Sequence, residues 1–239
     1  MTALVVIPAR GGSKGLPRKN LMTVGGRPLI AWTIAQALAA QNGPDGIRDL
    51  IVAVSTEDPE IADVARVHGA RVIERPVELA QDATPTEPVI LHAMDTVEAE
   101  GVELDAVVLL QATSPVRHPD TIRSAIRRFR SGQADSLVGV VPESPFFWHL
   151  PEGEGESARA EYDVDARPRR QDLRPEQMHY FENGSLYVTD PQIYRERSNR
   201  IGGRVGLFVL DEAEGVDIDT PADVAAAETM LARLGWSLS

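Results

Sequence analysis

Cysteine is absent from the 239 residues of this chain, which excludes a disulfide framework and a metal site built on thiolates. No apolar run approaches the roughly 20 residues that a helix needs to span a membrane. The N-terminus enters the apolar run Ala3–Ile7 directly, without the cationic region and the small-residue cleavage site of a signal peptide. Together these absences predict a cytoplasmic protein.

A positive net charge is also absent. The chain has 36 acidic and 24 basic residues, for a formal net charge of −12, whereas proteins that bind duplex nucleic acid or a membrane surface normally present a basic face. Basic residues nevertheless gather at two places, residues 10–19 and residues 167–174. Two cationic islands in an acidic chain favour small anionic substrates, although an arginine run such as the second island is more commonly a solvated loop.

Lysine is the scarcest charged residue, and both copies, Lys14 and Lys19, lie in one glycine-rich segment, whereas the other 22 basic residues are arginines. We call residues 9–20 the phosphate loop. Its glycines let backbone amides approach an anion, and compact ammonium groups beside them form a cradle for phosphates. The loop matches neither GxGxxG nor GxxxxGK[ST]. We still interpret it as a nucleotide-binding loop, because an ordinary strand-to-helix turn does not need so many cations.

Short, almost continuous apolar runs alternate with helical patterns, and this alternation predicts an α/β fold with parallel strands. Unbroken apolar runs are typical of strands that are covered on both faces. The predicted strands are residues 3–7, 50–54, 71–74, 106–110, 137–141, 185–189 and 204–210. The predicted helices begin at Pro28 and Pro59, where a first-turn proline costs no hydrogen bond, and occupy 89–97, 122–129 and 221–234.

The alternation breaks at residues 142–182, which contain five prolines, a stretch rich in glycine and glutamate, and the second arginine island. Regular structure resumes afterwards. We therefore predict a loop-rich insertion, or a small hairpin subdomain, within a single domain that spans residues 1–239. Inside it, the bulky side chains of Phe146, Phe147 and Trp148 form either local core or a contact between two subunits, and we favour the contact.

Motif-like segments recur along most of the chain. They are residues 7–20 (IPARGGSKGLPRKN), 75–82 (RPVELAQD), 109–117 (LLQATSPVR), 167–172 (RPRRQD), 182–187 (ENGSLY) and 216–219 (VDID). In this order they resemble the signatures of the acylneuraminate cytidylyltransferases, the CMP-sialic acid synthetases. The resemblance implies a three-layer α/β sandwich with a mostly parallel sheet, the nucleotide-diphospho-sugar transferase fold. It further implies that residues 142–182 are an inserted dimerisation element, and hence a homodimer.

The same resemblance implies a reaction in which CMP passes from CTP to the anomeric hydroxyl of a nine-carbon α-keto acid sugar, with release of pyrophosphate. Charge builds up on the leaving pyrophosphate, so convergent cations support both binding and catalysis. Arg10 and Lys19 are the implied catalytic cations. The implied nucleotide-binding residues are Arg10, Gly11, Gly12, Ser13, Lys14, Lys19 and Asn20.

The residues implied to bind the sugar are Gln111, Arg169, Asn183 and Tyr187. Gln111 follows a predicted strand directly, and ligands of open α/β sheets bind at the carboxyl ends of strands. Arg169 is expected to form a bidentate pair with the sugar carboxylate, and Arg170 remains an alternative to it. Tyr187 is nearly as well explained as an aromatic residue that packs within a strand.

Asp217 and Asp219 are the candidate ligands for Mg²⁺ in the motif that resembles the family's VDID. Carboxylates at positions i and i+2 of a strand end point to one side, and with phosphate oxygens and waters they suit octahedral Mg²⁺. The alternative role for the pair is capping of the next helix, but Thr220, Pro221 and Asp223 already supply an N-cap, a first-turn proline and an acid. We favour the metal site, with Asp217 as the candidate base for the attacking hydroxyl.

Alternatives remain open within and beyond this chemistry. The sugar acid can be a sialic, legionaminic, pseudaminic or ketodeoxynonulosonic acid, or the eight-carbon Kdo, which ranks last because Kdo enzymes carry a different N-terminal loop. A different pair, such as GTP with a hexose phosphate, also remains open. A non-catalytic nucleotide-sugar sensor is the alternative of another class. It predicts that the phosphate loop is broken or that the aspartate pair is missing, whereas this sequence has an intact loop and both aspartates.

Overall fold

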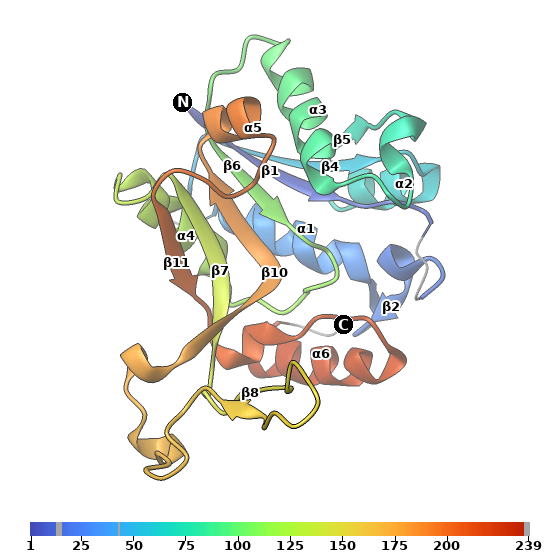
Figure 1. Cartoon of the computed structure of the whole chain (residues 1–239). Helices are drawn as coiled ribbons and strands as arrows, with labels where there is room; N and C mark the ends of the chain where they lie inside the picture. Colours follow the sequence, from blue (N-terminus) through green and yellow to red (C-terminus); the bar gives the residue numbers. More distant parts are fainter. Residues whose placement is uncertain (13–15, 43, 237–239) are drawn as a thin grey trace.

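A seven-stranded sheet forms the centre of the computed structural model, which describes residues 1–12, 16–42 and 44–236 (Figure 1). The strand order is β11-β7-β10-β6-β1-β4-β5. The bounds are β1 (Thr2–Pro8), β4 (Leu50–Thr56), β5 (Arg71–Glu74), β6 (Leu104–Leu110), β7 (Ser136–Glu143), β10 (His179–Thr189) and β11 (Val205–Val209). Neighbouring strands run parallel, except that β10 is antiparallel to both β6 and β7. The predicted mostly parallel α/β sheet is confirmed.

Helices cover both faces of this sheet and complete three layers. One face carries α1 (Leu29–Ala39), α2 (Pro59–Val67) and α4 (Thr121–Arg130), and the other carries α3 (Thr86–Glu98) and α5 (Pro191–Arg197). A further helix, α6 (Pro221–Arg233), packs on α1 and on the short strand β2 (Thr23–Val24), which pairs with β3 (Arg27–Pro28). None of the helices in the described residues is long and apolar enough to cross a bilayer.

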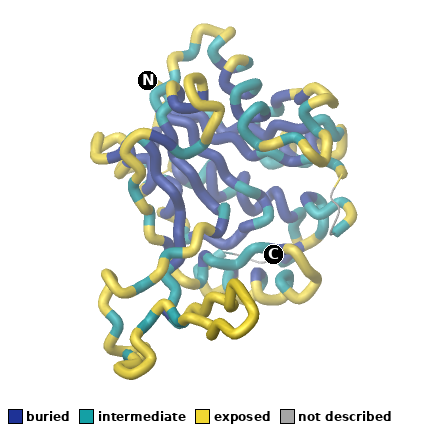
Figure 2. Tube along the Cα trace, viewed as in Figure 1, coloured by how far each residue is buried: buried dark blue, intermediate teal, exposed yellow. Residues whose placement is uncertain are grey.

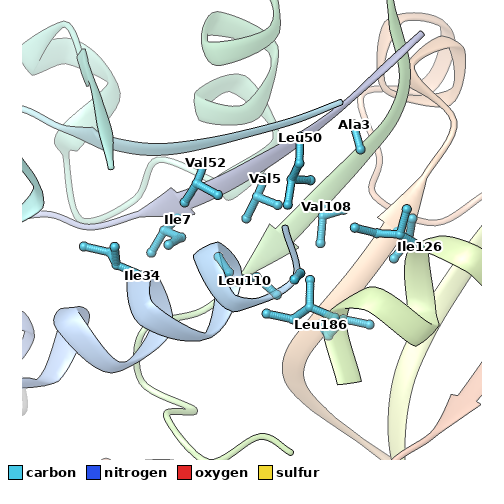
Figure 3. Packing of buried hydrophobic residues seen from close by; sticks show 14 of the residues in the cluster. Ala3, Val5, Ile7, Ile34, Leu50, Val52, Val108, Leu110, Ile126 and Leu186 are labelled. Carbon is cyan, nitrogen blue, oxygen red and sulfur yellow. The ribbon is translucent and has the colours of Figure 1, made fainter. Parts of the chain in front are cut away.

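The core explains why the strand segments are apolar without interruption. Along β1, Ala3, Val5 and Ile7 point to the layer of α1, α2 and α4, as Figure 3 shows for their packing with residues of neighbouring elements. Leu4 and Val6 point to the layer of α3 and α5. All five side chains are fully buried. A strand that is covered on both faces cannot show the alternation of polar and apolar residues that a half-exposed strand shows.

Strand β10 and helix α5 differ from the prediction. β10 begins at His179 rather than at Ser185, because its first part pairs with β7 alone and is largely exposed, so that it lacks an apolar run. A register shift follows at Glu182–Tyr187, where Gly184 has a φ of +76°. The helix α5 was not predicted at all. It is short, and its local signal is the Asp190 side chain, which accepts a hydrogen bond from the Gln192 amide at the N-terminus of the helix.

Between β7 and β10 the chain leaves the sheet as an arm, which we define as residues 144–178. It contains a hairpin of β8 (Trp148–His149) and β9 (Arg159–Ala160) and two short 3₁₀ turns, Arg170–Asp172 and Pro175–Gln177. The arm projects beyond the sheet beside α6 (Figure 1), and most of it is exposed (Figure 2). The sequence left two descriptions of residues 142–182 open, a loop-rich insertion and a small hairpin subdomain. The arm combines loops with one short hairpin. Three further 3₁₀ helices, Lys19–Leu21, Val77–Ala80 and Glu212–Gly215, lie in other loops.

Candidate active site

A cavity of about 380 Å³ lies beyond the carboxyl ends of strands β1, β5 and β6. In open α/β sheets this edge is where ligands bind. The phosphate loop, the β5–α3 connection and the segment before α6 all contribute to its wall. The predicted site residues that line it are Arg10, Lys19, Asn20, Gln111 and Asp219. The fold therefore gathers at one cavity residues from both ends of the sequence.

Lys19 and Asp219 form the contact that joins these two ends. The Lys19 Nζ donates to Oδ1 of Asp219 at 2.8 Å and to the carbonyl oxygen of Ile218 at 2.6 Å, across 200 residues of chain. The Lys19 side chain is 12% exposed and that of Asp219 is 74% exposed. An ammonium group anchored in this way is held at the cavity wall, while the carboxylate opposite it remains accessible to a ligand.

Capping of α6 does not require the Asp219 carboxylate. The side chain of Asp223 accepts hydrogen bonds from the amides of Asp219 (3.0 Å) and Thr220 (2.7 Å) and from the Thr220 hydroxyl (2.9 Å). These bonds hold the pKa of the Asp223 carboxyl below its usual value. The sequence predicted that Asp223, and not Asp219, is the acid that caps α6, and these bonds confirm it.

Asp217 lies beside the cavity and is not among its lining residues. Its Oδ1 accepts a hydrogen bond from the Ser114 hydroxyl at 3.2 Å, and the next residue, Ile218, donates its amide to the Thr113 carbonyl at 2.8 Å. Among the described residues no group of three or more His, Cys, Asp and Glu side chains comes together as a metal site. Mg²⁺ commonly uses one or two carboxylates together with substrate phosphates, so Asp219, the member of the pair that lines the cavity, fits that donor set, and Asp217 beside the cavity is the second candidate.

Arg10 and Gly11 of the phosphate loop are held by side chains from other parts of the chain. Arg10 Nη1 donates to Oδ1 of Asp82 at 2.7 Å, and the Arg10 carbonyl accepts from Nδ2 of the buried Asn20 at 3.1 Å. The Gly11 amide donates to Oε1 of Glu57 at 2.8 Å.

Gly12, the next predicted nucleotide-binding residue, is exposed. A Cβ added at Gly12 would meet no described atom within 4 Å, so this residue is open to its surroundings. The predicted nucleotide-binding residues Ser13 and Lys14 lie outside the described residues.

Gln111 is positioned by close packing at the end of β6. The Gln111 side chain packs directly on Gly184, where an added Cβ would stand 2.9 Å from its Oε1, and the φ of +76° favours glycine at this position. The buried Arg117 donates to the carbonyl oxygens of Gln111 (3.1 Å) and Ser185 (2.6 Å), and so joins the end of β6 to the middle of β10. Burial lowers the pKa of Arg117 to about 10, while the nearby Glu214 carboxylate opposes this shift.

The other predicted sugar-binding residues do not line the cavity. Asn183 is buried; it donates to the carbonyl oxygen of Glu214 at 2.9 Å and accepts from the Ser185 amide at 3.2 Å, which stabilises the register shift in β10. Tyr187 is 3% exposed in the core beneath α3 and α5 and donates to Glu182. Burial raises the pKa of the Tyr187 hydroxyl.

Arg169 and Arg170 lie on the arm, outside the cavity lining. The Arg169 side chain is 73% exposed and pairs with Asp172 at 2.5 Å. The Arg170 guanidinium lies 5.7 Å from the centre of the Phe146 ring. Neither contact distinguishes which of the two arginines binds a carboxylate, so that choice stays a prediction.

Sequence reasoning gave no role to the β5–α3 connection, yet Arg75, Asp82 and residues 84–86 line the cavity. Arg75 is buried, and its Nη2 donates to the Ala9 carbonyl at 3.0 Å and to Oε2 of Glu57 at 2.6 Å. The available signal was the segment RPVELAQD itself, which contains a lone arginine directly after a strand and an aspartate at its end.

Comparison with known protein families gives a consistent result. A sequence model described as cytidylyltransferase matches residues 4–201. N-acylneuraminate cytidylyltransferase A of Danio rerio is 34% identical over 233 residues, which are 97% of this chain and 51% of that protein. CMP-N,N'-diacetyllegionaminic acid synthase of Legionella pneumophila is 35% identical over 97% of both chains. Pseudaminic acid cytidylyltransferase of Campylobacter jejuni is 30% identical over 96% of both chains. The chain thus spans about half the length of the Danio rerio relative and nearly all of the two bacterial ones.

Solved structures share the fold. A CMP:2-keto-3-deoxy-manno-octonic acid synthetase complexed with CTP superposes with a TM-score of 0.67 at 19% identity, covering 98% of this chain and 99% of that one. A 4-diphosphocytidyl-2C-methyl-D-erythritol synthase of Anaerococcus prevotii gives a TM-score of 0.63 at 11% identity, with coverage of 97% and 99%. At these identities the likeness concerns the architecture alone.

Proposed function

Because the chain belongs to the cytidylyltransferase family, we propose that it transfers CMP from CTP to the anomeric hydroxyl of a nonulosonic acid and releases pyrophosphate. The relatives named above act, by their names, on N-acylneuraminate, N,N'-diacetyllegionaminic acid and pseudaminic acid, which supports this class of sugar. The single observation that carries the proposal is the contact of Lys19 with Asp219 at the cavity wall, 2.8 Å between Nζ and Oδ1. A reaction that consumes CTP also agrees with the cytoplasmic location that the sequence predicts.

The cavity offers the charges that this reaction needs. Arg10 and Lys19 line it from the phosphate loop, and each is paired with a carboxylate, that of Asp82 and that of Asp219 respectively. The oxygens of a bound triphosphate compete with these carboxylates for the two cations. As CMP is transferred, charge accumulates on the leaving pyrophosphate, and the two cations stabilise it.

Asp219 and Asp217 are the residues that would hold Mg²⁺, with the remaining positions left to phosphate oxygens and water. When bound, the ion neutralises phosphate charge and polarises the phosphorus that is attacked. We keep Asp217 as the proposed base for the sugar hydroxyl. Its half-buried carboxylate accepts one hydrogen bond, from Ser114, and keeps further capacity to accept a proton.

For the sugar, we propose that Gln111 contacts it from the cavity wall, while Asn183 and Tyr187 support the surrounding strand. Arg169 lies on the arm and does not line the cavity of its own chain. We therefore propose a homodimer in which the arm reaches the partner subunit. The exposed apolar side chains of the arm, with Trp148 at 56% and Leu150 at 87%, support this proposal.

Replacing Trp148 by glutamate is expected to convert the dimer into a monomer of 26.0 kDa. The reason is that a charge would have to be buried where an aromatic ring now contacts the partner. Light scattering coupled to size-exclusion chromatography measures the mass. The matched control is Val67→Glu, at an 81% exposed position on α2, which is expected to leave the dimer intact. A wild-type monomer, or a Trp148→Glu variant that stays dimeric, contradicts the role of the arm.

The reaction itself is tested by pyrophosphate release from CTP, ATP, GTP and UTP, each with a panel of sialic, legionaminic, pseudaminic and ketodeoxynonulosonic acids and Kdo. We expect release with CTP and at least one nine-carbon acid. Release with GTP and a hexose phosphate, and none with CTP, would contradict the proposal. If CTP raises the melting temperature but no sugar acid supports turnover, the sensor alternative takes its place.

A further inference from the structure

Two adjacent acidic residues, Glu57 and Asp58, follow strand β4 directly, and both lie against the phosphate loop. We propose that Glu57 is a positioning residue for nucleotide binding. Its carboxylate holds the Gly11 amide with one oxygen and the Arg75 guanidinium with the other, at 2.8 and 2.6 Å. The inference rests on the proposed function, because it concerns how the same cavity is held ready for CTP.

The contacts of Glu57 join the carboxyl ends of three neighbouring parallel strands, β1, β4 and β5. Ala9, Glu57 and Arg75 are each the first residue beyond one of these strands. The Ala9 amide donates to Ser55 and the Arg75 amide donates to Thr56, both at 3.0 Å, so the sheet ladder continues into this cluster. Glu57 is thus fixed by the sheet itself and serves as a rigid support for the loop.

Side chains hold the backbone of three consecutive loop residues. Arg75 binds the Ala9 carbonyl, Asn20 binds the Arg10 carbonyl, and Glu57 binds the Gly11 amide. The side chain of Arg10, which lines the cavity, therefore projects from a backbone that is held on both sides. A backbone segment such as residues 9–11 that is held in place before binding loses little conformational freedom when the nucleotide arrives, and this strengthens binding.

The ion pair of Asp58 with Arg18 supports the same stretch of backbone. A Cβ added at Gly11 would collide with the Asp58 carboxylate and stand 3.1 Å from Nη1 of Arg18, so the backbone at Gly11 packs directly against this ion pair. Arg18 has a φ of 56°, a left-handed conformation that is rare for residues other than glycine, and its bonds to Asp58 and Glu60 hold it there. The Arg18 guanidinium in turn holds the pKa of the Asp58 carboxyl below its usual value.

A carboxylate beside an anion site would normally repel the ligand. Here Arg75, whose side chain is 4% exposed, cancels the charge of Glu57, whose side chain is 17% exposed. The contribution of Glu57 is therefore the placement of the loop and not an electrostatic attraction. The placement role predicts a larger loss of CTP affinity for Glu57→Ala than for Glu57→Gln.

Glu57→Ala removes the acceptor for the Gly11 amide and is expected to raise the Kd and the KM for CTP about tenfold, with kcat and the KM for the sugar acid within about twofold of wild type. Glu57→Gln retains one oxygen for that amide, although its NH2 group cannot accept from Arg75, which keeps its bond to the Ala9 carbonyl; the Kd is expected to stay within about threefold of wild type. The control is Glu74→Ala, at an 88% exposed side chain one residue before Arg75. Calorimetry with CTP and Mg²⁺ gives the Kd, and steady-state kinetics give the other constants.

Hydrogen exchange at the Gly11 amide gives a readout that does not depend on turnover. It is expected to be faster in Glu57→Ala than in wild type and close to wild type in Glu57→Gln and Glu74→Ala. If hydrogen exchange and CTP affinity are both unchanged in Glu57→Ala, the positioning role is wrong but the proposed function stands. An equal loss of affinity in Glu57→Ala and Glu57→Gln leads to the same conclusion. A wild-type chain that binds no CTP overturns the proposed function and this inference with it.

Discussion

Replacement of Asp219 by alanine is expected to lower metal-dependent turnover about 1000-fold, because a bound metal ion contributes several kcal/mol to the transition state and each 1.36 kcal/mol is a factor of ten in rate. Asp219 is the carboxylate of the proposed metal pair that lines the cavity. Its loss would leave only Asp217, which lies beside the cavity and is bound to Ser114. The variant therefore keeps the nucleotide cavity but loses the accessible protein ligand for the ion.

The fold of the Asp219→Ala variant is expected to be unchanged. The side chain is 74% exposed, and the start of α6 is capped by Asp223. Lys19 keeps its bond to the Ile218 carbonyl at 2.6 Å after its ionic partner is removed.

Pyrophosphate release measured against Mg²⁺ concentration tests this expectation, with EDTA added to wild type as the metal-free reference. Asp63→Ala is the matched control, since that aspartate is 76% exposed on α2, and it is expected to behave as wild type. Wild-type turnover in Asp219→Ala at every Mg²⁺ concentration would exclude Asp219 as a metal ligand.

Replacement of Arg117 by methionine is expected to lower the free energy of unfolding by about 3–5 kcal/mol, a large part of the roughly 5–15 kcal/mol that holds a domain folded. The guanidinium donates to the carbonyl oxygens of Gln111 and Ser185, to Oε1 of Gln36 at 3.0 Å and to the Thr33 hydroxyl at 3.4 Å. Methionine fills similar space but removes the donor from these buried acceptors, at a cost of about 1–3 kcal/mol for each group that is left unsatisfied.

One opposing effect limits the loss. Burial disfavours the charge of Arg117, as its pKa of about 10 indicates, so methionine also removes a desolvation cost. Denaturant unfolding followed by circular dichroism measures the balance. Arg128→Met, at an exposed position of α4, is the control and is expected to change the free energy of unfolding by less than about 0.5 kcal/mol. A loss below about 1 kcal/mol for Arg117→Met would mean that the cost of burying the charge cancels its hydrogen bonds.

The layered α/β fold could be predicted from the sequence because runs such as Ala3–Ile7 are buried on both faces and therefore remain apolar throughout. The direction of β10 could not. An apolar run has the same composition whichever way the strand points. In addition, the arm of residues 144–178 separates β7 from β10 in the sequence, so their pairing in the sheet has no local signal. Antiparallel neighbours are easily recognised only when a short turn joins them.

The candidate site was predictable to the extent that each residue had a local signal. Lys19 and Asp219 were predicted from the loop and from the aspartate pair, and they meet in the structure. The expectation that both aspartates point to one side assumed a strand. Residues 216–218 instead lie outside the sheet, and only Asp219 lines the cavity. The support of the loop by Glu57 and Arg75 depends on the order of strands in the sheet, which no single segment encodes.

The contact of Lys19 with the Ile218 carbonyl and Asp219 has a consequence for synthesis on the ribosome. A chain emerges from its N-terminus first, and the elements β1, β4, β5 and β6 can begin to assemble before the segment that precedes α6 has been made. At that stage Lys19 still lacks its bonds to Ile218 and Asp219. A chain that has emerged only as far as β11 therefore has the strands of the sheet, but it lacks the part of the cavity wall that Asp219 supplies.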